Sequence, residues 1–167
     1  MAKASSLSTG VKWAVLITLA YMVFSLLMLW FPTNTFIGLF TYVIFIGGII
    51  LALRDFRTNN GGVMTYEQGL GTATLTGVFL GLLLALLSYM LFKYIDPVML
   101  DEMIAIQKEA LEQQQQLDEE TMATYVSVLE YFRSPSTIGL MVFAFFVIMS
   151  FIVGLIASIF LKKAPSY

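Results

Sequence analysis

The chain has 167 residues, of which 59% are hydrophobic and 12% are charged, with a formal net charge of −2. A soluble domain is closer to half apolar and a quarter charged, so this composition indicates an integral membrane protein. The 9 lysines and arginines form no basic stretch, which excludes a typical nucleic-acid-binding protein. Because the sequence contains no cysteine and no histidine, it has no disulfide, no thiolate or imidazole metal ligand and no cysteine nucleophile.

Four long apolar runs follow one another along the chain, at residues 13–31, 36–53, 70–92 and 138–161. A bilayer core needs about 20 apolar residues in a helix, so each run predicts a membrane-spanning helix. The first run is longer than the apolar part of a signal peptide and no A-x-A site follows it, so we expect an uncleaved anchor. The turn after it is predicted at residues 31–34. The expected architecture is therefore all-α and polytopic, a single membrane domain over residues 1–167.

The charged residues predict an orientation in the membrane. Six of the nine basic residues lie before the first run, between the second and third runs, and after the fourth: Lys3, Lys12, Arg54, Arg57, Lys162 and Lys163. Cytoplasmic loops carry an excess of lysine and arginine, so we expect both termini in the cytoplasm. Nine of the eleven acidic residues lie between Asp96 and Arg133, and this segment is then extracytoplasmic.

Residues 96–135 predict a helical insert, either a hairpin or one bent helix. Asp96 and Pro97 are typical of a helix start, and Asp118 or Thr121 is a second N-cap. Apolar residues recur at helical spacing in two stripes: Met99, Met103, Ile106, Ala110 and Leu117, then Met122, Tyr125, Leu129 and Phe132. We expect the two stripes to pack on each other, with the Gln113–Gln116 run on the solvated surface.

Two other interpretations of the insert remain open. It could bind a protein partner through the apolar residues Met103, Ile106, Met122, Tyr125, Leu129 and Phe132. It could instead lie flat among lipid headgroups, although surface-bound helices are usually basic and this segment is acidic.

Small residues form a ridge along the third run. They recur every four residues: Gly69, Ala73, Gly77, Gly81 and Ala85. The fourth run carries Ser150, Gly154 and Ser158 at the same spacing. Small residues let helix backbones approach closely in lipid, so we expect these two ridges to face each other inside one bundle. A seam between subunits is the alternative.

Glu67 is the one carboxylate that we expect near the membrane. It lies between Thr65 and Gln68, whose Thr-x-x-Gln spacing predicts a capping box at a helix start. A helix N-terminus favours a negative charge, which gives Glu67 a structural role. The alternative is an ion site at the cytoplasmic mouth of a conduit.

A metal site is not expected. Asp96 is more than one helical turn from Asp101 and Glu102, and each of the three has a capping or surface role. We therefore predict no catalytic residue, no metal and no cofactor.

Three stretches resemble the DUF4199 family. Residues 61–70 resemble the family's stretch that opens a span, residues 94–97 its Y-x-D-P motif, and residues 154–163 its closing span with a basic end. Leu70 stands where an aromatic residue is usual. The resemblance implies a small four-span membrane protein of Bacteroidota, in the inner membrane with the acidic segment in the periplasm. It implies no activity and no site residues.

The leading functional prediction is a non-enzymatic membrane subunit or scaffold, in contact with lipid and with a protein partner or a second copy of itself. The first alternative is an oligomeric conduit for cations or small solutes. The second is a membrane enzyme that acts on a lipid-linked substrate through carboxylates near the headgroups.

Overall fold

The computed structural model describes residues 4–28, 30, 35–112 and 118–163. The predicted turn at residues 31–34, the Gln113–Gln116 run and Leu117 lie outside the described residues. The elements in chain order are α1 (Ser6–Met28), α2 (Thr35–Asn59), α3 (Tyr66–Met90), the π-helical turn η1 (Leu91–Ile95), α4 (Pro97–Glu112), α5 (Glu119–Tyr131) and α6 (Pro135–Leu161).

Four helices in the described part of the chain are long and apolar enough to cross a membrane. They are α1, α2, α3 with η1, and α6, and their mean hydropathy lies between 1.8 and 2.8. The predicted all-α polytopic architecture is therefore confirmed. The helix α2 continues beyond Leu53 as far as Asn59, so its last turns carry the charged residues Arg54, Asp55 and Arg57.

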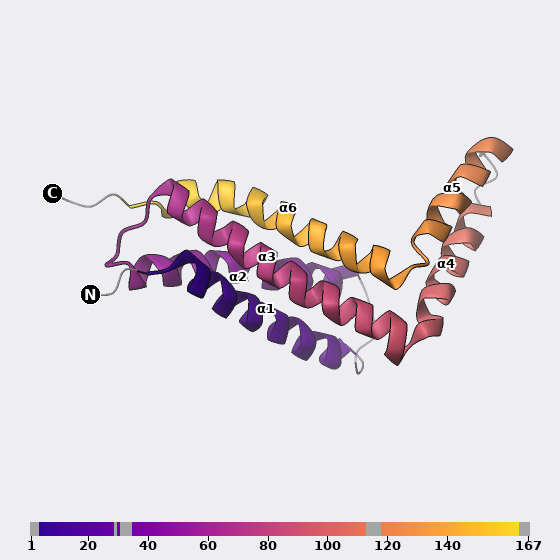
Figure 1. The fold of residues 1–167 in the computed structure, drawn as a ribbon, viewed down its shortest axis with the longest axis horizontal. Coiled ribbons are helices and arrows are strands. Elements are labelled where there is room, and N and C mark those ends of the chain that lie inside the picture. Colours follow the sequence, from indigo (N-terminus) through magenta and orange to yellow (C-terminus); the bar gives the residue numbers. More distant parts are fainter. Residues whose placement is uncertain (1–3, 29, 31–34, 113–117, 164–167) are drawn as a thin grey trace. The chain divides into compact units, whose positions relative to one another are not determined.

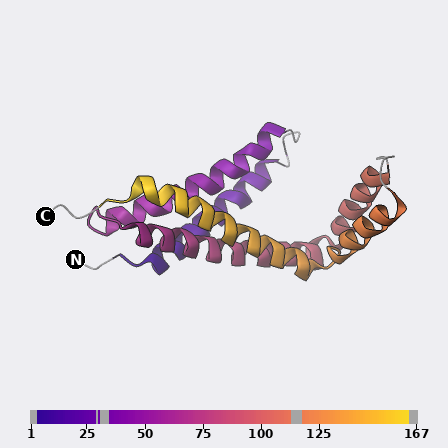
Figure 2. The same cartoon turned by 90° about the horizontal axis from the view of Figure 1, so that it is seen from above.

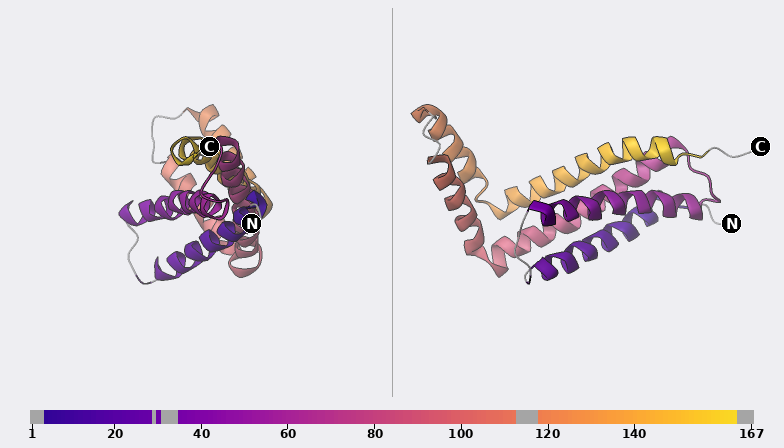
Figure 3. Two further views of the ribbon diagram at one scale, coloured as in Figure 1. Left: turned by 90° about the vertical axis from the view of Figure 1, so that its left-hand side faces the viewer. Right: turned by 180° about the vertical axis from the view of Figure 1, so that it is seen from behind.

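The chain divides into two compact units, Met1–Leu83 with Phe143–Tyr167 and Leu84–Val142. In the first unit α1, α2, α3 and α6 run in alternating directions, as Figures 1 and 3 show from opposite sides. The ring of Phe146 on α6 lies 6.1 Å from that of Tyr21 on α1 and 5.4 Å from that of Phe45 on α2. One α6 side chain therefore ties α1 and α2 together in the apolar core.

The connection from α2 to α3 reverses the chain at two glycines. Gly61 and Gly62 have φ angles of 71° and 80°, a left-handed region that side chains with a Cβ rarely adopt. Met64 then exchanges two backbone hydrogen bonds with Lys163, at 3.0 and 2.8 Å. The end of α6 is therefore fixed to the start of α3.

The second unit contains a hairpin of α4 and α5, which lie side by side (Figure 2). The predicted first N-cap is confirmed, since the Asp96 carboxylate accepts a hydrogen bond from the Met99 N–H at 3.1 Å. Two ion pairs hold α4 to α5 and to the residues that follow α5: Lys108 pairs with Glu130 at 3.0 Å, and Asp101 pairs with Arg133 at 2.7 Å. Each exposed pair contributes at most about 1 kcal/mol, so apolar contacts must supply most of the pairing energy.

Candidate functional site

The hairpin buries a different stripe of α4 from the one that the sequence indicates. Leu100 and Ile104 are 5% and 9% exposed, whereas Met99, Met103 and Ile106 are 38%, 48% and 65% exposed. Ile104 lines a small cavity of about 150 Å³ between the helices, together with the ion-paired residues. The expected packing of the Met99 stripe against α5 is therefore wrong, because the neighbouring stripe occupies that place.

This arrangement leaves an apolar surface outside the spans. We call Met99, Met103 and Ile106 the free face of α4. Glu102 and Glu109, both exposed, lie beside it at the 100° per residue of a helix. Exposed apolar groups that cluster and are rimmed by charge are typical of a protein-interaction surface.

The four α5 residues of the predicted partner surface differ in their exposure. Tyr125 is exposed, whereas Met122, Leu129 and Phe132 are half-buried. Met122 and Leu129 lie about two helical turns apart, so they share one side of the helix. Tyr125 is therefore the one of these four that is most open to a partner.

The start of α5 is capped by Asp118, whose carboxylate accepts a hydrogen bond from the Thr121 N–H at 3.3 Å. Hydrogen bonding from the Thr121 side chain, and then from its backbone, lowers the pKa of Asp118 below its usual value. Because the pKa is lower in the folded state, this stabilisation is complete above the unfolded pKa of about 3.9 and is lost as the pH falls through the folded value.

We therefore expect hydrogen-exchange protection in the first turn of α5 to fall as the pH drops below about 4, after correction for intrinsic rates. Asparagine caps equally well but does not titrate, so Asp118→Asn should lose less protection than wild type over the same range. The two proteins differ only at residue 118, so the difference between their pH profiles reports on the cap. Identical pH profiles would contradict the assignment.

The small residues of α3 and α6 lie against each other. A Cβ atom at Gly69 would lie 2.6 Å from the Ser158 Oγ, and one at Gly154 would lie 2.7 Å from the Ala73 Cβ. Farther along the helices, the same contact repeats with Gly77 against Ser150, Gly81 against Phe143, and Ala85 against Gly139. The ridge of α3 is therefore used in packing within the chain.

Glu67 is exposed in the first turn of α3. The predicted capping box around it is confirmed: the Thr65 N–H donates to the Gln68 Oε1 at 3.0 Å, and the Gln68 N–H donates to the Thr65 Oγ1 at 3.2 Å. Glu67 thus stands in the first turn of the helix, where the dipole favours a negative charge.

Asp55 is a second carboxylate in a spanning helix, and sequence reasoning did not single it out. It is held by three groups: its Oδ2 accepts from Lys12 Nζ at 2.8 Å and from the Trp13 Nε1 at 2.9 Å, and its Oδ1 accepts from Asn59 at 3.0 Å. The bonds from Lys12 and Trp13 fix the first part of α1 to the end of α2. The apolar run stops at Leu53, and a partner more than 40 residues away along the chain leaves no local signal.

The carboxylates considered for a metal site have separate roles. Asp96 caps α4 and Asp101 pairs with Arg133, while Glu102 is exposed. Among the described residues, no three acidic side chains are grouped closely enough to hold a metal ion.

These features define a polytopic all-helical membrane protein with an amphipathic helix pair outside its spans. The sequence model of the DUF4199 family, whose description is "Protein of unknown function", matches residues 12–163, and the chain belongs to this family. No curated protein and no solved structure matches the chain. Two of the stretches that carry the resemblance meet in the first unit, where Met64 pairs with Lys163.

Proposed function

We propose that this protein is a non-enzymatic subunit or scaffold of the inner membrane, and that it binds a protein partner through the hairpin. The observation that carries the proposal is the free face of α4. A neighbouring stripe of the same helix already buries Leu100 and Ile104, so the free face is not needed to hold the hairpin together.

The side chains of the free face suit a protein contact. Methionine is flexible and polarizable and adapts to irregular surfaces. An interface usually depends on a few apolar anchors, and truncating one costs about 2 kcal/mol or more. Ile106 is the most exposed of the three at 65%, which makes it the expected anchor.

The charges around the free face indicate the chemistry of the partner. Glu102 and Glu109 lie along one side of it, whereas the hairpin cations Lys108 and Arg133 are already in ion pairs. A matching surface would present an apolar groove with a lysine or arginine rim. With the termini in the cytoplasm, as the basic residues favour, this partner meets the hairpin on the extracytoplasmic side.

Site-specific photocrosslinking tests the proposal. A benzoylphenylalanine at Ile106 should give one discrete crosslinked protein in living cells, because the bound partner would cover this position and lie within reach of the crosslinker. The same residue at Ser127, an exposed polar position on α5, is the matched control and should give at least tenfold less of that product. Equal yields from both positions, or no product from Ile106, would refute the proposal.

A further inference from the structure

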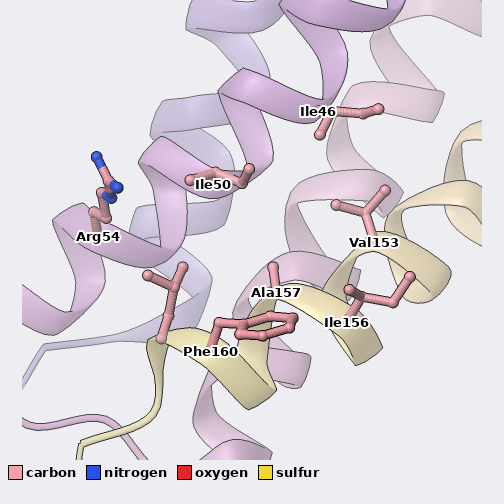
Figure 4. A pocket seen from close by; sticks show the side chains of 8 residues that line it. Ile46, Ile50, Arg54, Val153, Ile156, Ala157 and Phe160 are labelled. Atoms are coloured by element: carbon pink, nitrogen blue, oxygen red, sulfur yellow. The ribbon is translucent and has the colours of Figure 1, made fainter.

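An apolar groove runs between α2 and α6 in the first unit (Figure 4). Its volume is about 380 Å³, and seven of its eight lining residues are apolar, among them Ile46, Ile50, Ala157 and Phe160. Both helices are long and apolar enough to cross a membrane, so the groove faces the acyl chains of a bilayer. Its occupant must therefore be apolar over most of its length.

One charged side chain, Arg54, stands at the end of this groove where α6 finishes (Figure 4). It is exposed, and within the described residues it takes part in no ion pair. Lys162 and Lys163, both exposed, follow directly on the end of α6. The Arg57 guanidinium donates to the Leu161 carbonyl at 3.3 Å, which keeps the ends of α2 and α6 together. The groove thus leads from an apolar wall to a basic rim.

We propose that this groove binds an anionic phospholipid, with one acyl chain along the apolar wall and the phosphate on Arg54. Contact with the wall alone cannot select a lipid, because bulk acyl chains are equally apolar. Selection comes from the headgroup. A guanidinium binds phosphate through two parallel hydrogen bonds, and nearby lysines attract an anionic headgroup further.

A second copy of the chain is the competing occupant. A two-fold contact through this face would bring the same basic surface of each copy towards the other. Like charges would then oppose the contact, whereas they favour an anionic lipid. Phe160, which is 80% exposed, lines the groove near its basic end and adds to the apolar surface open to an acyl chain.

Native mass spectrometry of the full chain in detergent tests the proposal, with phosphatidylglycerol and phosphatidylcholine of identical acyl chains as probes. We expect wild type to bind phosphatidylglycerol at least about fivefold more tightly than phosphatidylcholine. Arg54→Gln should remove most of that preference: it should weaken phosphatidylglycerol binding more than phosphatidylcholine binding, because both lipids carry the phosphate but only phosphatidylglycerol has a net negative charge. Lys108→Gln removes one positive charge in the hairpin and should behave as wild type.

A second pair of variants tests the groove itself and does not depend on Arg54. Ala157→Phe fills the groove and should weaken the binding of both lipids, whereas Ile159→Phe, an exposed position outside the lining, should not. Equal affinity of wild type for the two lipids, or unchanged phosphatidylglycerol binding in Arg54→Gln, would overturn the proposal. A lipid-free dimer that Ala157→Phe dissociates would also overturn it, and would assign the groove to a second copy.

Discussion

Replacing Gly77 with alanine should lower the melting temperature of the protein, whereas replacing Gly71 on the same helix should not. A Cβ atom at Gly77 would overlap the Ser150 side chain and lie 2.9 Å from the Phe146 carbonyl oxygen, a backbone atom that cannot move aside easily. At Gly71 a Cβ atom would meet nothing within 4 Å. Overpacking costs about 1–3 kcal/mol, while alanine in a helix gains about 0.5–1 kcal/mol over glycine.

Gly77→Ala should therefore lower the free energy of unfolding, whereas Gly71→Ala should leave it unchanged or raise it. Thermal unfolding in detergent should show Gly77→Ala lower by a few degrees, at about 2–4 °C per kcal/mol, and Gly71→Ala equal to or above wild type. Adding Ser150→Gly to Gly77→Ala should recover part of the loss, because it removes one of the two colliding groups. Equal melting temperatures for the two alanine variants would show that α3 and α6 do not pack closely at Gly77.

Ile104→Ala should open the hairpin far more than Ile106→Ala, although the two residues are alike and lie on one helix. Ile104 is 9% exposed and lines the space between α4 and α5, so its truncation should cost about 2 kcal/mol, the lower end of the range for a buried isoleucine. Ile106 is 65% exposed, and its truncation should change stability by no more than about 0.5 kcal/mol.

Hydrogen exchange followed by mass spectrometry measures this difference directly. Peptides from α4 and α5 should lose protection about thirtyfold in Ile104→Ala and almost none in Ile106→Ala. Peptides from α1 and α2 serve as the internal control. A larger loss in Ile106→Ala would mean that the stripe indicated by the sequence, and not the observed one, holds the hairpin together.

The four spans could be predicted from the sequence because an uninterrupted run of about 20 apolar residues is typical of a membrane-spanning helix. The residues at which the spanning helices end could not be predicted in the same way. The helix α2 continues to Asn59 because Asp55 finds Lys12 and Trp13 on another helix, and hydropathy contains no information about such a contact. The caps at Asp96 and Thr65 are local hydrogen bonds between residues three apart, which is why the sequence was sufficient there. For the start of α5 the sequence left Asp118 and Thr121 open, and the structure shows Asp118 as the cap.

The free face of α4 was predicted less well, because its exposure also depends on a contact with another helix. The helix α4 carries two adjacent apolar stripes, one through Leu100 and Ile104 and one through Met103 and Ile106. Helical periodicity fits both, and only the position of α5 decides which stripe is buried. The groove between α2 and α6 could not be predicted from the sequence either, since its two walls are about 100 residues apart along the chain.

Co-purification of charge variants of the free face tests the central claim most directly. The double variant Met103→Glu with Ile106→Glu places two carboxylates on the free face, while Ala123→Glu with Ser127→Glu adds the same charge at exposed positions of α5. Proteins recovered with each tagged variant from mild-detergent extracts would be quantified against wild type. The free-face variant should lose a stoichiometric companion more than tenfold, and the α5 variant should retain it. Equal recovery of every companion by both variants would contradict partner binding through this face.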